Sequence, residues 1–232
     1  MVGKLDVVVG IIGGGSMGGS IARGLVESGE LDASRVLVAD SEAQKREAFS
    51  ELGMRVFEDA AALAAERPDV VVLAVKPQVL GDVMASVASM LDGTCVISIA
   101  AGVSLSTIEA ALPGARVVRV MPNLPVQVRS GATAVTGGPR ATADDVELAC
   151  KIFSALGSVA VMREDQLDVS GAVVGTAPAF FSLFVDALTR AAVLRGLPAA
   201  AAREPERISS LYSKPGVRQW QCRSTKAGST VS

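Results

Sequence analysis

The chain has 232 residues, of which 50% are hydrophobic and 20% are charged, and its formal net charge is −2. This length accommodates one α/β domain and a smaller second unit, but not two full-sized domains. The absence of histidine excludes His-based catalytic triads, His metal clusters and a histidine general acid.

Other classes are disfavoured by what the sequence lacks. Cys95, Cys150 and Cys222 are too widely spaced to indicate a disulfide framework or a metal site. With 3% aromatic residues and no basic stripe, the sequence offers no nucleic-acid surface. It shows no secretory signal pattern and no uninterrupted apolar run of roughly 18 residues. We therefore expect a cytoplasmic protein with no metal, no nucleic-acid partner and no membrane segment.

Runs of Val, Ile, Leu and Ala recur along the chain with helical patterns between them. The clearest are Val7–Ile12, Val36–Ala39, Val70–Val75, Val96–Ile99 and Val117–Val120. Because they are continuous rather than alternating, they predict strands of a parallel sheet that is covered on both faces. Capping-box spacing in Ser41 with Gln44, and in Ser106 with Glu109, predicts helix starts between the strands.

Two further short strands, Thr133–Val135 and Val159–Val161, are expected to close the sheet, with a helix over Thr142–Leu156 between them.

A glycine-rich turn directly follows the first predicted strand. Gly13-Gly14-Gly15-Ser16-Met17-Gly18 matches G-x-G-x-x-G and precedes a helical pattern that reaches about Ser28. In this motif Gly13 permits the tight turn, Gly15 lets the backbone approach a pyrophosphate, and Gly18 lets the helix pack on the strand. The helix N-terminus adds free N–H groups and the positive end of a dipole. The pattern predicts a nicotinamide-dinucleotide site, with a ligand-free glycine turn as the alternative.

Asp40 ends the second predicted strand, close to the spacing of about 20 residues at which an acidic side chain accepts the ribose hydroxyls. A carboxylate here favours NAD over NADP, because it repels a 2′-phosphate. Lys45 and Arg46 lie one helical turn further on and offset that repulsion, so either cofactor remains open. The alternative role for Asp40 is to support the helix start beside Ser41.

These patterns predict an α/β fold: a Rossmann-type, mostly parallel sheet with helices on both faces over residues 1–163, then a smaller all-α dimerisation region over 164–203. Helical spacing of Phe180, Phe184 and Leu188 is typical of a core or interface helix. Such a helix on a small unit is readily buried between subunits, so we expect a homodimer, with larger homo-oligomers as the extension. Residues 204–232 form an atypical tail with no periodic pattern.

Several ordered motifs extend beyond the glycine turn. They are Leu73-Ala74-Val75-Lys76-Pro77, Ser98-Ile99-Ala100-Ala101-Gly102-Val103, Val118-Arg119-Val120-Met121-Pro122-Asn123-Leu124-Pro125, Gly131-Ala132-Thr133-Ala134 and Gly196-Leu197-Pro198. In this order the sequence resembles pyrroline-5-carboxylate reductase, the enzyme of the last step of proline biosynthesis. The resemblance implies an oxidoreductase that acts on a C=N bond and reduces the cyclic imine 1-pyrroline-5-carboxylate to L-proline with NADPH or NADH, NADPH being the family's expected cofactor.

The resemblance also implies residue roles, while the catalytic residue stays unassigned. The cofactor would contact Ile12, Gly13, Gly14, Gly15, Ser16, Met17, Gly18, Asp40, Ser41, Asp59, Ala74, Val75, Lys76, Pro77, Ile99, Ala100 and Ala101. The substrate would contact Asn123, Glu164, Ser229 and Thr230. The alternatives are strand-end core for Val75 and Ile99, a solvated charge for Lys76, a turn residue for Asn123 and a surface charge for Glu164.

The sequence departs from this family near its C-terminus. Members usually read S-G-S-G-P-A-Y where this chain has Val174-Gly175-Thr176-Ala177-Pro178-Ala179-Phe180, and Gly171 replaces a threonine. The segment after Arg203 does not read as the family's long helices, and only the stretch from Ser224 to Thr230 loosely matches the family's substrate loop. The alternative function is therefore a catalytically impaired nicotinamide-dinucleotide-binding protein without a complete substrate site.

Overall fold

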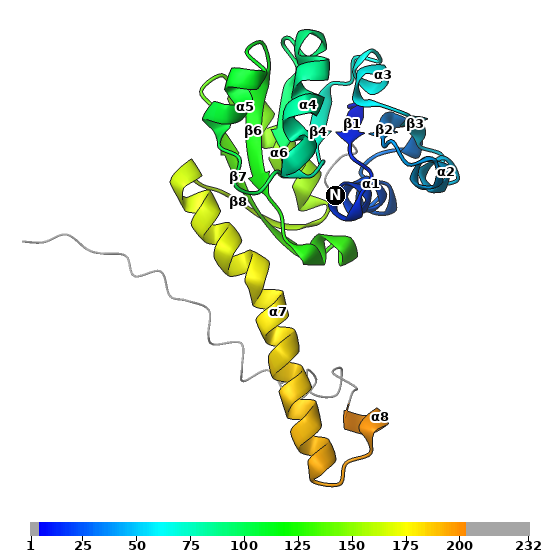
Figure 1. Cartoon of the computed structure of the whole chain (residues 1–232), viewed down its shortest axis with the longest axis vertical. Helices are drawn as coiled ribbons and strands as arrows, with labels where there is room; N and C mark the ends of the chain where they lie inside the picture. Colours follow the sequence, from blue (N-terminus) through cyan, green and yellow to red (C-terminus); the bar gives the residue numbers. More distant parts are fainter. Residues whose placement is uncertain (1–4, 203–232) are drawn as a thin grey trace, which may run out of the picture. The chain divides into compact units, whose positions relative to one another are not determined.

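A computed structural model describes residues 5–202, and within them an eight-stranded sheet has the order β3-β2-β1-β4-β5-β6-β7-β8 (Figure 1). The strands are β1 Val9–Ile12, β2 Val36–Ala39, β3 Arg55–Phe57, β4 Val70–Leu73, β5 Cys95–Ser98, β6 Arg116–Met121, β7 Gly131–Gly137 and β8 Gly157–Val161. All neighbouring strands run parallel except β6 and β7, which are antiparallel. The predicted Rossmann-type, mostly parallel sheet is confirmed.

Helices cover both faces of this sheet, and each face has its own hydrophobic core. They are α1 Ser16–Glu27, α2 Ala43–Ser50, α3 Ala60–Ala64, α4 Pro77–Val87, α5 Leu105–Ala111 and α6 Ala143–Ser154. Alternate strand residues enter opposite cores: in β4, Val70 and Val72 pack with α1, α2 and α6, whereas Val71 and Leu73 pack with α3, α4 and α5. This two-sided burial explains why the strands read as continuous apolar runs.

Two predicted helix caps are wrong. Helix α2 begins at Ala43, and Glu42 rather than Ser41 is its capping residue. The cap of α5 is Ser104, whose hydroxyl accepts the N–H of Thr107. At α5 the serine two residues ahead of Ser106 makes the cap, whereas at α2 no side chain caps the first turn and Asp40 accepts the N–H of the capping residue Glu42. The capping box that does form belongs to α6 and joins Thr142 to Asp145.

Strand β3 was absent from the sequence prediction. It has only three residues, lies at the edge of the sheet and is only partly buried, so its sequence lacks the apolar run that marked the other strands.

The chain divides into two compact units, one ending at Pro178 and the next beginning at Ala179. Helix α7, Glu164–Leu194, contains that division, and α8 is Ala199–Ala202. In the second unit the Thr189 hydroxyl donates to the carbonyl of Ala202 and so links α7 to α8. The predicted boundary after residue 163 stays a prediction, and the tail over 204–232, with Ser229 and Thr230, lies outside the described residues.

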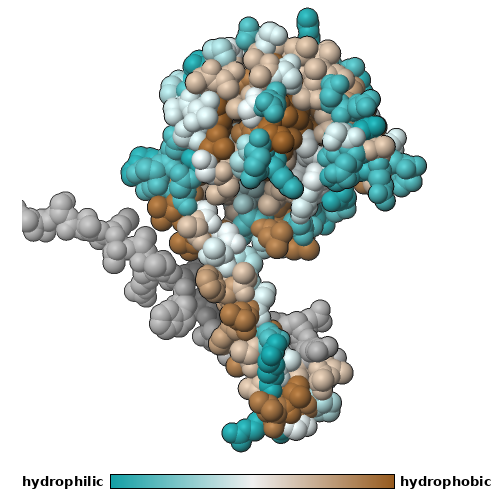
Figure 2. Space-filling model, in the orientation of Figure 1, coloured by the Kyte–Doolittle hydropathy of each residue, from teal (hydrophilic) through white to brown (hydrophobic). Residues whose placement is uncertain are grey.

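Helix α7 exposes a large apolar surface (Figure 2). Its exposed side chains include Val169, Val173, Phe180, Phe181, Leu183 and Phe184, and Phe181 is 72% exposed. By length and composition alone α7 is also able to cross a membrane. Those two properties do not distinguish a membrane span from a helix that is covered by another subunit.

Candidate functional site

The glycine-rich turn joins β1 to α1 at the carboxyl end of the sheet. Gly13 adopts φ +106°, and its N–H donates to the carbonyl of Ala39 at 2.8 Å. A Cβ atom on Gly13 would lie 2.8 Å from the carbonyl of Ala74, and one on Gly18 would lie 2.0 Å from the carbonyl oxygen of Gly13. The fold itself therefore requires glycine at both positions.

Gly15 is different. Its backbone is extended, with φ −68° and ψ −165°, which other residues also adopt. A Cβ atom built on it would meet no heavy atom within 4 Å. Nothing within the described fold requires this glycine, although it immediately precedes α1, where the first N–H groups of the helix are free. A bare backbone at a helix N-terminus is what close approach of a diphosphate needs, so the turn fits a dinucleotide.

A pocket of about 410 Å³ lies beside this turn, at the carboxyl ends of β1, β2 and β4. Its walls are Ile12, Gly13, Ala39, Asp40, Ser41, Asp59, Ala60, Val75, Val79, Asp82, Val83 and Ser86. The order of the strands reverses between β1 and β4, and α/β folds bind ligands in the crevice at such a point. Six predicted cofactor residues meet here: Ile12, Gly13, Asp40, Ser41, Asp59 and Val75.

Sequence reasoning missed the contribution of α4 to this pocket. One face of this helix borders the pocket. It carries residues spaced three, one and three positions apart: Val79, Asp82, Val83 and Ser86. The periodicity of the sequence predicted a helix here, but it did not predict which face of that helix would border the glycine turn.

Asp40 is tied into the turn by its backbone neighbours. One carboxylate oxygen accepts the N–H of Gly14 at 2.8 Å, and the other accepts the N–H of Glu42 at 2.9 Å. The Lys45 ammonium lies 3.8 Å from the carboxylate and 2.5 Å from that of Glu42. The hydrogen bond to Glu42 raises the pKa of Lys45. Asp40 thus supports the start of α2, as the alternative interpretation held, while its side chain also borders the pocket.

The remaining cofactor candidates lie at the ends of neighbouring strands or in the glycine turn. Ala74 donates its N–H to Ile12, and Ile99 donates to Leu73, so these strand ends are adjacent. Ala74 and Ile99 are half-buried and Ala100 is buried, whereas Lys76, Pro77 and Ala101 are exposed. None of these six lines the 410 Å³ pocket, nor do Gly14, Gly15, Ser16, Met17 and Gly18. In the turn, the Ser16 hydroxyl accepts a hydrogen bond from the side-chain amide of Gln127 at 3.0 Å.

The two described substrate candidates make internal hydrogen bonds. The Asn123 amide oxygen accepts the N–H of Ala132 at 2.8 Å, and its nitrogen donates to the carbonyl of Val174 at 3.3 Å. One Glu164 oxygen accepts the N–H of Leu105 at 2.6 Å. Both side chains therefore hold the fold together around the start of α7.

Arg119 was not singled out from the sequence and is among the largest fully buried side chains of the described fold. Its guanidinium lies 3.3 Å from Glu164 and 2.5 Å from Asp168, and so connects β6 to the first turns of α7. A charged residue within the apolar strand Arg116–Met121 was the available signal.

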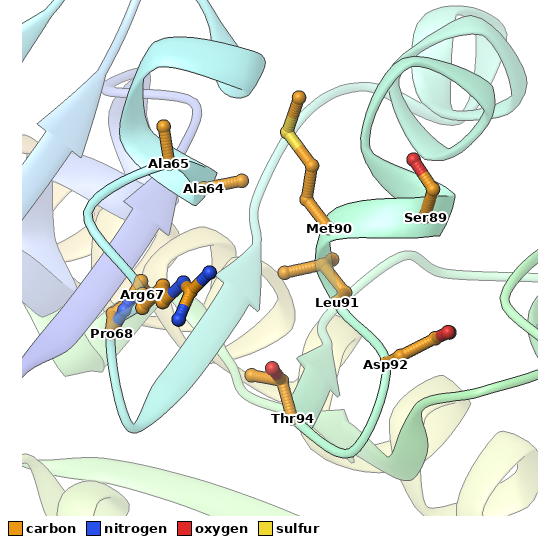
Figure 3. Close-up of a pocket in the computed structure, with 9 residues that line it drawn as sticks. All are labelled: Ala64, Ala65, Arg67, Pro68, Ser89, Met90, Leu91, Asp92 and Thr94. Atoms are coloured by element: carbon orange, nitrogen blue, oxygen red, sulfur yellow. The ribbon is translucent and has the colours of Figure 1, made fainter.

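A larger pocket, of about 620 Å³, lies elsewhere (Figure 3). Arg67 and Pro68 border it just before β4 begins, and Thr94 borders it just before β5. It is therefore at the amino ends of these strands, the edge opposite the glycine turn. None of the predicted site residues lines it, and size alone does not make it the functional site.

Comparison with known proteins agrees with this geometry. The family model described as NADP oxidoreductase, coenzyme F420-dependent, matches residues 8–102, and that of pyrroline-5-carboxylate reductase dimerisation matches residues 164–205. Pyrroline-5-carboxylate reductase of Methanosarcina acetivorans is 38% identical over 192 residues, which cover 82% of this chain and 71% of the relative. The chain belongs to the pyrroline-5-carboxylate reductase family.

Solved structures of the family share the fold. The reductase of Coxiella burnetii superposes with a TM-score of 0.83 at 34% identity, covering 89% of this chain and 78% of that one. The enzyme of Plasmodium falciparum, solved with NADP bound, gives a TM-score of 0.82 at 23% identity, covering 95% and 82%. The dimerisation match includes all of α7 and supports a homo-oligomer.

Proposed function

We infer that this protein catalyses the NAD(P)H-dependent reduction of 1-pyrroline-5-carboxylate to L-proline. Membership of the family supplies the reaction, since a relative at 38% identity carries the name of that reductase. The single structural observation that carries the inference is Gly15, a glycine that the fold does not need but a bound diphosphate does.

The main task of the residues of this chain is to bind the dinucleotide and the substrate and to align them for hydride transfer. The glycine turn and the N-terminus of α1 hold the diphosphate. When bound, the dinucleotide supplies the hydride for the imine carbon. The ends of β4 and β5, with Ala74, Val75, Lys76, Pro77, Ile99, Ala100 and Ala101, fix the distance and orientation of that transfer, which accounts for a large part of the rate. A cyclic imine protonates readily, so the lack of histidine is no obstacle.

Glu164 and Asn123 are proposed to act at the substrate side. Glu164 uses one oxygen within the fold, yet its side chain remains 37% exposed, so its charge is accessible to a protonated imine. Asn123 is 8% exposed and fixes the turn after β6, which makes it a positioning residue in this proposal. Ser229 and Thr230 remain proposed donors to the substrate carboxylate.

The proposed assembly is a homodimer, or a larger homo-oligomer, built on α7. The match to the family's dimerisation model over residues 164–205 and the exposed phenylalanines of α7 support it. We also propose a cytoplasmic location, which suits an enzyme of amino-acid biosynthesis.

The test is oxidation of NADH and of NADPH by the purified chain with 1-pyrroline-5-carboxylate, followed by absorbance. Gly15→Ala should lower the free energy of unfolding by no more than about 1 kcal/mol, the cost of alanine at the cap of α1, yet weaken dinucleotide binding at least about tenfold. Gly81→Ala is the matched control, because a Cβ atom there also meets nothing within 4 Å and Gly81 does not line the pocket. Normal binding by Gly15→Ala would refute the proposed diphosphate site. Saturable dinucleotide binding without turnover would favour the impaired binding protein instead.

A further inference from the structure

We propose that this chain selects NADH over NADPH, and that Asp40 is the residue that discriminates between them. The proposal rests on the proposed function, because it concerns the same dinucleotide site. It starts from the charges around the 410 Å³ pocket beside the glycine turn.

The wall of that pocket is acidic. It contains the three carboxylates Asp40, Asp59 and Asp82 and neither a lysine nor an arginine. The two dinucleotides differ only in the phosphate on the 2′ oxygen of the adenosine ribose, and a phosphate monoester carries about −1.5 to −2 charges at neutral pH. Like charges within one partly enclosed pocket repel, so the phosphorylated form is at a disadvantage there.

Asp40 is the acidic group that cannot move away from an incoming ribose. The N–H groups of Gly14 and Glu42 hold its two oxygens from opposite sides of the turn, and its side chain is only 10% exposed. These bonds occupy two of the roughly four acceptor positions of a carboxylate. The remaining lone pairs are suited to accept hydrogen bonds from ribose hydroxyls, which only the unphosphorylated form offers in full.

The two nearby cations make their contacts at the start of α2, outside the pocket wall. Lys45 pairs with Glu42 at 2.5 Å and with Asp40 at 3.8 Å. Arg46 directs Nη1 to the carbonyl oxygens of Asp40 and Ser41, at 2.8 and 2.9 Å. Neither residue lines the pocket, so a 2′-phosphate would meet them only after these surface contacts rearrange. In the arrangement that the structure shows, neither Lys45 nor Arg46 offers its charge to the pocket.

The experiment measures dissociation constants for NADH and NADPH by fluorescence titration of the full chain, without substrate. We expect the unchanged protein to bind NADH at least about tenfold more tightly, equivalent to about 1.4 kcal/mol. Asp40→Ser should tighten NADPH binding, weaken NADH binding and shift the ratio of the two constants by at least about tenfold. The preference should also shrink as salt is raised, because its cause is electrostatic.

Two further variants keep the test decisive if Asp40→Ser disturbs the turn. Asp82→Asn removes a pocket charge that lies on α4, away from the Gly14 contact, and should narrow the preference about two- to threefold. Asp144→Asn, which removes an exposed charge at the start of α6, should leave the preference unchanged. Equal affinities in the unchanged protein, or tighter NADPH binding, would overturn the selectivity, and a ratio of the two constants that Asp40→Ser leaves unaltered would overturn the role of Asp40. If neither dinucleotide binds, the site and its selectivity both fail; if NADH binds selectively without turnover, only the proposed reaction fails.

Discussion

Replacing Asp145 by asparagine should destabilise the first unit, because this carboxylate joins the start of α6 to the start of β6. It accepts hydrogen bonds from the Thr142 N–H at 2.8 Å and hydroxyl at 2.7 Å, and from Arg116 Nε at 2.9 Å. Burial by itself raises the pKa of Asp145, but the hydrogen bonds from Arg116 and Thr142 outweigh it and lower the pKa to about 2.

The size of the effect follows from that pKa. Relative to the ordinary aspartate pKa of 3.8, a folded pKa of about 2 corresponds to about 2 kcal/mol of stability from the ionised carboxylate. Arg116 is 36% exposed, so solvent screens part of its contribution, and we expect a loss of about 1 to 2 kcal/mol for Asp145→Asn at pH 7. Because the folded pKa is the lower one, this stabilisation is complete above about pH 4 and disappears as the pH falls towards 2.

Urea unfolding followed by circular dichroism, at pH 7, 5, 4 and 3, measures the difference between the two proteins. The difference should be constant from pH 7 to 5 and should shrink below pH 4. Asp144→Asn is the control, since Asp144 lies in the same helical turn but is exposed, and it should change stability by less than about 0.5 kcal/mol. A loss as small as that of the control at pH 7, or one that grows as the pH falls, would refute the assigned role of Asp145.

Three other variants test the turn, the buried arginine and the assembly. Gly18→Ala should lower the free energy of unfolding by more than about 1 kcal/mol and abolish dinucleotide binding, because the alanine Cβ would lie 2.0 Å from the Gly13 carbonyl oxygen. An unchanged melting temperature would contradict this prediction. Arg119→Met should lower the free energy of unfolding in urea by about 1 to 3 kcal/mol. This loss is smaller than that for breaking a fully buried ion pair, because the side chains of its acidic partners are 37% and 59% exposed. No measurable loss would contradict a stabilising ion pair. Phe181→Glu combined with Phe184→Glu should yield monomers in light scattering, and an unchanged oligomer would place the interface elsewhere.

Much of the first unit was predictable because its information is local. Strands buried on both faces must be apolar throughout, so five of the eight stood out as uninterrupted runs. The glycine turn was equally legible, since a strand, three spaced glycines and a helix follow one another in the chain. Prediction failed where several residues could occupy a helix cap: Ser41 and Ser106 had the right spacing, but Glu42 holds the cap position of α2 and Ser104 caps α5.

The amino-acid sequence alone determined the sheet, the nucleotide turn and the family, because each depends on residue types at short, fixed spacings. Only the tertiary structure decided how side chains far apart in the chain meet. It brought Asp82 on α4 to the same pocket as Asp40, and it gave Glu164 the N–H of Leu105 and the guanidinium of Arg119 as partners. Such contacts depend on packing between elements. A periodic pattern predicts that a helix has a buried face, but it does not predict which residues that face contacts.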